Sequence, residues 1–173
     1  MDRFTLRHLT LAVALSTSMG TVFAATSNDF VDNAAAGGIA EIETSRLALE
    51  KSSSADIKAF ANMMITAHSK ANDELAALAK KNDIEVPDST TLVKQAKEKI
   101  LDLRDESFDA AYANNQVKAH EDTIELFKKE ANTVTDDKVK GATDLKGFAQ
   151  KMLPALEKHL DMAKKLQAAH PSK

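Results

Sequence analysis

The sequence has no cysteine and no tryptophan, and it contains only 5 glycines and 3 prolines among 173 residues. Without cysteine the chain has neither disulfide bonds nor thiolate metal ligands, and we expect no lipid anchor. So few glycines and prolines argue against a collagenous or low-complexity chain. The fold must therefore be held together by packing, and any metal ion must be bound by nitrogen, oxygen or thioether ligands.

The chain also lacks a strong surplus of charge of either sign. It has 23 basic and 26 acidic residues, a formal net charge of −3, and 43% of its residues are hydrophobic. A protein that binds nucleic acid through phosphates normally carries a clear basic surface, so we expect no nucleic-acid partner. The composition is that of a globular, helix-rich protein.

The N-terminus has the three regions of a secretory signal. Basic residues precede the apolar run 9–15, and Val22 and Ala24 provide suitable side chains three residues and one residue before a cleavage site. We expect residues 1–24 to be removed and residues 25–173 to form a single domain with 21 basic and 25 acidic residues, a net charge of −4. The alternative is an amphipathic helix that stays in the mature protein. Export without a later apolar span predicts a periplasmic protein in a Gram-negative host.

Apolar residues recur at helical spacing in four long segments that are separated by turn-forming and capping residues. We expect helices over residues 29–52, 56–82, 107–134 and 144–169. Ser27 or Asn28 is expected to cap the first helix, and Ser54 the second. The connection 83–106 is read as a crossover that contains a shorter helix. Four amphipathic helices of similar length predict an all-α four-helix bundle.

Two adjacent glycines interrupt the first predicted helix. Gly37 and Gly38 each cost about 1 kcal/mol relative to alanine in a helix interior. We therefore expect another helix to approach closely at this point, or else the early turns of the helix to fray.

Three histidines are the strongest candidates for a functional site. His68, His120 and His159 each fall on the inward stripe of a different predicted helix, and Glu41 takes the corresponding place in the first helix. Glu41 lies 13 residues before Ser54, at the turn between the first two helices, and His68 lies 14 residues after it. His120 and His159 lie 13 and 15 residues after the start of their helices, so we expect all four at one level near the middle of the bundle.

Imidazole and carboxylate groups that converge in a bundle core are a sensible metal site for Zn, Fe, Cu or Mn. Burial also demands partners for these groups, because an unpaired buried polar group costs about 1–3 kcal/mol. The alternative is that each histidine bonds separately to a neighbour such as Tyr112, Gln116 or Glu43.

Two specific kinds of metal chemistry find less support. Carboxylate-bridged di-iron bundles place a glutamate three residues before a histidine on each of two helices, but Ile65 and Leu156 stand there before His68 and His159. A ferroxidase-type site is therefore not expected. Thioether ligands for copper are available, although methionines at helical spacing are more often core residues. The methionines concerned are Met63, Met64, Met152 and Met162.

Three motifs resemble the exported bacterial family called domain of unknown function 4142, over about residues 30–166. These motifs are Phe60-Ala61-x-x-Met64-x-x-x-His68, Phe108-Asp109-x-x-Tyr112 and Leu153-Pro154-x-Leu156-x-x-His159-Leu160. The resemblance implies a ferritin-like four-helix bundle exported to the cell envelope, without an established activity. Some members carry the label "predicted outer membrane protein", but no segment of this sequence supports an outer-membrane association.

The leading functional hypothesis is an exported bundle without enzymatic activity, used in envelope stress or metal handling, with Glu41, His68, His120 and His159 as the site. The alternative is a structural or protein-interaction module of the periplasm whose histidines only pack. Either function is compatible with an envelope protein partner or with self-association. A metal-dependent redox enzyme is the third hypothesis, and the missing di-iron spacing argues against it.

Overall fold

In the computed structural model the described residues are 28–88, 90–93, 107–136 and 138–172. The predicted signal segment lies outside them. Within the described residues the long elements are all helices, namely α1 (Asp29–Lys51), α2 (Ala55–Lys81), α4 (Phe108–Ala131) and α5 (Ala142–Ala169). The predicted all-α four-helix bundle is confirmed.

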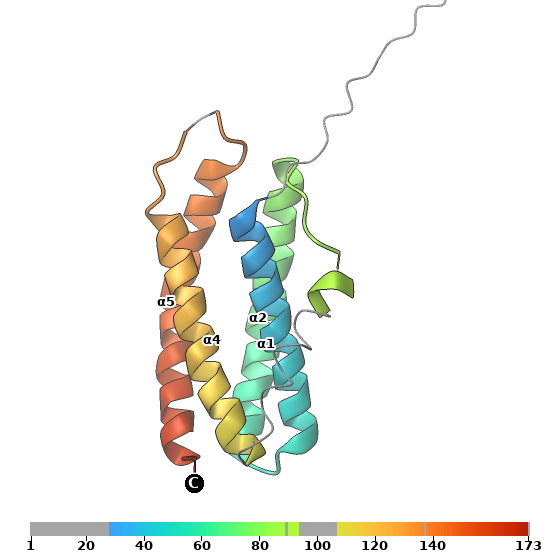
Figure 1. Cartoon of the computed structure of the whole chain (residues 1–173), viewed down its shortest axis with the longest axis vertical. Coiled ribbons are helices and arrows are strands. Elements are labelled where there is room, and N and C mark those ends of the chain that lie inside the picture. The colour runs from blue at the N-terminus through green and yellow to red at the C-terminus, as the bar shows by residue number, and fades with distance from the viewer. Residues whose placement is uncertain (1–27, 89, 94–106, 137, 173) are drawn as a thin grey trace, which may run out of the picture.

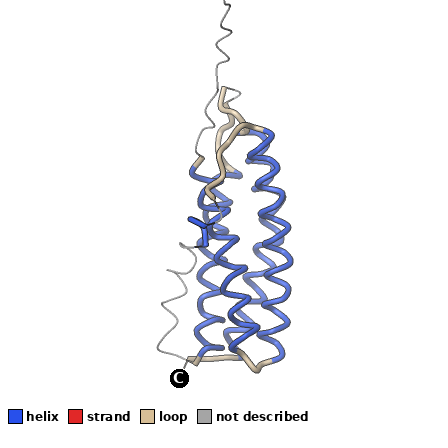
Figure 2. The backbone as a smooth tube through the Cα atoms, turned by 90° about the vertical axis from the view of Figure 1, so that its right-hand side faces the viewer, coloured by secondary structure: helices blue, strands red, loops and turns tan. Residues whose placement is uncertain are grey.

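The helices form two antiparallel hairpins, α1 with α2 and α4 with α5 (Figure 1). α1 also packs against α4, whereas α2 and α5 contact each other much less. α2 ends and α4 begins at opposite ends of the bundle (Figure 1), and the view turned by 90° shows all four helices running along the long axis (Figure 2). This is the connectivity of ferritin-like bundles, in which one long crossover joins two hairpins.

Local side-chain bonds set the helix ends. Asn28 caps α1, since its side-chain Oδ1 accepts a hydrogen bond of 3.0 Å from the Val31 amide. Ser54 takes the N-cap position of α2, but its hydroxyl bonds to Asp56 and not to a backbone amide. The prediction that α4 extends to residue 134 was wrong, because the side chains of Asn132 and Thr133 donate to carbonyls of the last turn and end the helix.

The predicted crossover helix is described only at its start. Residues 90–93 are helical, and Leu92 within them is buried against the core. Asp88 accepts hydrogen bonds from the amide and the hydroxyl of Thr91, at 2.9 and 2.7 Å, which is the expected way to begin a helix. The later positions of this predicted helix lie outside the described residues.

Two apolar clusters fill the bundle, one toward each end. The first cluster includes Phe30, Phe127 and Phe148, and the second includes Ile57 and Phe60. Buried polar side chains lie at or near the boundary between the two clusters on three of the four helices: Glu41, Thr44, Ser45, His68, Gln116 and His120. The middle of the bundle is therefore a buried polar layer, which is what the sequence predicted for the level of the histidines.

The two glycines of α1 have different surroundings. A Cβ atom added to Gly38 would collide with the side chain of Asn72 in α2, whose amide donates to the carbonyl of Ala35. The predicted close approach is thus confirmed at Gly38. At Gly37 an added Cβ meets only the Thr123 hydroxyl, at 4.0 Å, which is ordinary contact.

This difference predicts opposite effects of the same substitution at neighbouring positions. Gly37→Ala should raise the free energy of unfolding by about 0.5–1 kcal/mol, because it gains helix propensity without a clash. Gly38→Ala should lower it by about 1 kcal/mol or more, because Asn72 must move. Urea unfolding of both variants beside the wild type checks this, and equal effects would contradict the proposed contact.

Candidate metal centre

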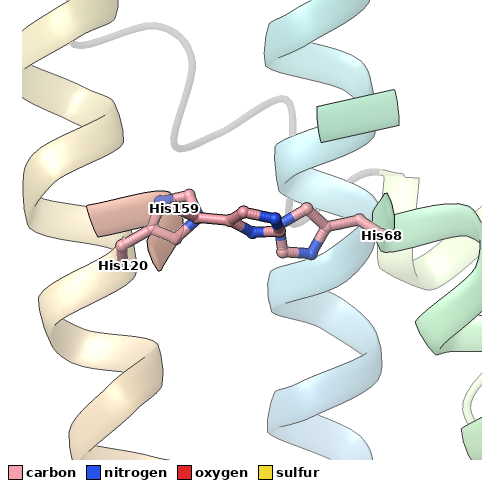
Figure 3. Close-up of side chains that lie close together, drawn as sticks. All are labelled: His68, His120 and His159. Carbon is pink, nitrogen blue, oxygen red and sulfur yellow. The ribbon is translucent and has the colours of Figure 1, made fainter. Parts of the chain in front are cut away.

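Three helices bring their histidines together at the middle of the bundle. His68 from α2, His120 from α4 and His159 from α5 each offer a ring nitrogen, and these nitrogens lie within 4.8 Å of one another. The ring centroids are 5.6, 5.8 and 5.6 Å apart, so the rings form a nearly equilateral triangle. Figure 3 shows the three side chains reaching toward one another. His68 and His120 are buried, and His159 is half-buried.

The hydrogen bonding of His120 defines which of its nitrogens is available. Its Nδ1 lies 2.8 Å from the backbone carbonyl of Gln116. A carbonyl only accepts, so Nδ1 carries the hydrogen, and in the neutral ring Nε2 keeps its lone pair. Ligating histidines are commonly held in this way by a hydrogen bond from the other ring nitrogen. The ring of His120 is thus oriented and in the tautomer that binds a metal through Nε2.

Each of the three rings has one buried nitrogen without a hydrogen-bond partner among the described residues. These atoms are Nε2 of His68, Nε2 of His120 and Nδ1 of His159. Buried polar atoms in folded proteins are nearly always paired, so three unpaired nitrogens in one cluster call for a common partner.

All three histidines are held in the neutral form. Burial is the largest cause in each case, and it lowers the pKa of His68 to about 3 and that of His159 to about 4. The neighbouring imidazoles lower both values further. The pKa of His120 is also lowered by burial, although the hydrogen bond to the Gln116 carbonyl opposes the shift. Neutral imidazole is the form that binds metal ions.

Glu41 does not belong to this group of three. It is buried, with 4% of its surface exposed. Burial raises the pKa of Tyr112, and the Glu41 carboxylate raises it further, so the carboxylate lies close enough to act on the phenol. Tyr112 is two turns before His120 in α4. The structure thus brings together three of the four predicted ligands and leaves Glu41 outside the group.

Two of the three separate partners considered for the histidines, Tyr112 and Glu43, have other contacts. The Tyr112 hydroxyl lies 2.9 Å from Oγ of Ser45, and Glu43 accepts a hydrogen bond of 2.7 Å from Arg46. Gln116 bonds to His120 through its backbone, while its fully buried side-chain amide has no hydrogen-bond partner among the described residues.

A pocket of about 320 Å³ opens between α2 and α5 beside the histidines. Its walls come from all four helices and are mainly apolar, with His68 and His159 among the lining residues. Across its opening, Lys151 of α5 pairs with Glu74 of α2 at 2.6 Å. Sequence reasoning missed this pocket. Small side chains near the histidines in sequence could have indicated it, because they leave space between the helices: Ala67, Ala71 and Ala155.

A family model described as a domain of unknown function, DUF4142, matches residues 12–166. The chain belongs to the DUF4142 family. The suspected family is therefore confirmed. No curated protein and no solved structure matches this DUF4142 chain. Among the described helices, none has the length and apolar character needed to cross a membrane.

The metal-free DUF4142 protein should lose stability as the pH falls below about 6.5. The pKa values of His68 and His159 are about 3 and 4 when folded and about 6.5 when unfolded, so in this window the unfolded chain binds more protons. Each such histidine costs up to about 1.4 kcal/mol of stability per pH unit. Urea unfolding with a chelator from pH 7.5 to 5 measures this loss. A flat profile, or an equal slope in a His68→Gln, His159→Gln variant, would contradict it.

Proposed function

We propose that this protein binds a divalent transition-metal ion in the cell envelope through His68, His120 and His159. The observation that carries the proposal is the set of three unpaired, buried ring nitrogens on three different helices. One metal ion would satisfy all three nitrogens at once. The export signal predicted at residues 1–24 supports the location, and handling of metal ions or response to envelope stress is the role that fits it.

The spacing of the rings supports this function. The point equidistant from the three centroids lies about 3.3 Å from each, close to the roughly 3.2 Å between a zinc ion and the centroid of an imidazole bound at about 2.0–2.1 Å. Ligand nitrogens around a tetrahedral ion are about 3.4 Å apart. Nitrogens within 4.8 Å of one another therefore need only small side-chain rotations to bind.

The ligand set favours Zn²⁺ or Cu²⁺ among the candidate metals. Three neutral imidazoles suit ions late in the first transition row, whereas Mn²⁺ prefers oxygen ligands. Methionine sulfur adds little to the copper case, since Met64 belongs to one apolar cluster and Met152 packs against the other. Three protein ligands leave one position of a tetrahedral ion for another ligand.

Metal content and heat stability test the proposal directly. Protein purified without an affinity tag should hold close to one equivalent of Zn²⁺ or Cu²⁺ per chain after incubation and desalting. At a free-ion concentration 100 times the Kd, binding should add about 2.7 kcal/mol of stability and raise the Tm by about 5–10 °C. His68→Ala, His120→Ala and His159→Ala should each weaken binding at least about 100-fold.

The chain offers a matched control for these variants. His170 lies at the end of α5, 3.0 Å from Asp56 and away from the cluster, so His170→Ala should keep full metal binding. Circular dichroism of each variant separates loss of a ligand from loss of the fold. Less than a tenth of an equivalent in the wild type, with no rise in Tm, would refute the metal proposal and favour the structural or interaction module.

A further inference from the structure

We infer that the pocket between α2 and α5 holds a small carboxylate with an apolar tail, whose head completes the coordination of the metal ion. This inference rests on the proposed function, because it requires an ion at the histidines. It adds a second ligand class, a site for it and a direction of entry.

The position of the pocket gives the direction of entry. His68 and His159 line the pocket, and they come from α2 and α5, which pack against each other much less than the two helices of either hairpin do. The other sides of the cluster are closed by the tightly packed pairs α1 with α2 and α4 with α5. An ion bound by three histidines would therefore offer its fourth position toward this pocket.

Charge balance favours an anion at that position. A divalent ion with three neutral imidazoles carries two positive charges, and the buried carboxylate of Glu41, which lies outside the group of three, would balance at most one of them. An uncompensated charge in a mainly apolar surrounding is costly, so an anionic fourth ligand is favoured over a neutral one. At the opening Lys151 is paired with Glu74, so the exposed Lys70 leaves these three residues with one net positive charge, which attracts anions.

The lining explains why the remainder of the ligand should be apolar. Away from the histidines the walls are formed mainly by Leu75, Phe127, Phe148, Met152 and Leu156. These side chains can hydrogen-bond nothing, so they favour a hydrocarbon tail over a sugar or a peptide. A volume of about 320 Å³ is at the small end of ligand pockets, which fits a short-chain carboxylate better than a long fatty acid.

The test uses sodium octanoate as the probe and acetate as the head group without a tail. Calorimetric titration of the Zn²⁺-loaded protein should give an octanoate affinity at least 30-fold higher than that of acetate, rising steadily through butyrate and hexanoate. The metal-free protein should bind octanoate at least 10-fold more weakly. In the Co²⁺-loaded protein, octanoate should shift the visible absorption bands, because it joins the coordination sphere.

A variant with a larger side chain in the pocket tests whether octanoate binds there. Ala71 lines the pocket, so Ala71→Phe should keep Zn²⁺ binding and lose at least 10-fold of the octanoate affinity. The matched control is Ala76→Phe, on the exposed side of the same helix, which should bind octanoate like the wild type. The chain-length series needs no variant, so it stays decisive if Ala71→Phe does not fold.

The outcomes separate the two proposals. Zn²⁺ binding with no preference for octanoate over acetate, or with equal octanoate affinity in the metal-free protein, would overturn this inference and leave the metal site intact. Absence of Zn²⁺ and Cu²⁺ binding would overturn both. If Ala71→Phe leaves the octanoate affinity unchanged, octanoate binds outside this pocket and the assignment is overturned.

Discussion

Burial of three imidazoles at one level of the bundle is the constraint on which the remaining structure depends. His68, His120 and His159 lie between two apolar clusters, where a charged ring would be costly. Burial therefore keeps the rings neutral and directs a nitrogen of each into a shared space. The backbone of α4 adds to this, because the Gln116 carbonyl orients His120. Packing thus produces both the fold and the chemical state of the candidate site.

Most of the fold could be predicted from the sequence, because amphipathic helices reveal their inward faces through spacing alone. Side chains within the first five positions of the four helices are buried, as the helical spacing of apolar residues predicts: Phe30, Ile57, Tyr112 and Leu145. The same periodicity brought the three histidines to one level, since residues on the inward face at equal distance from a helix end must lie near one another. Helix ends were less predictable. The end of α4 depends on side-chain bonds of Asn132 and Thr133, which compete with helix propensity.

The details of the site depend on where side chains point and on how far apart the helices lie, and the periodicity of the sequence encodes neither. Glu41 is buried as predicted, yet it acts on Tyr112 and lies outside the group of three, because a helix face is broad enough to direct side chains to different neighbours. The pocket depends on how far apart α2 and α5 lie, and small residues such as Ala71 only permit such a gap. Spacing along one helix therefore predicts which side chains are buried, but not which of them meet.

The distribution of the histidines over the two hairpins links the site to the stability of the whole bundle. His68 belongs to the α1–α2 hairpin, whereas His120 and His159 belong to the α4–α5 hairpin. The hairpins meet mainly through α1 and α4, while α2 and α5 are joined across the pocket by surface pairs such as Glu74 with Lys151. Exposed ion pairs contribute little stability, typically under about 1 kcal/mol. An ion held by all three histidines would connect α2 to α5 on the side where packing is weakest. Metal binding and association of the two hairpins would therefore be thermodynamically coupled, since whatever separates the hairpins would also break such a site.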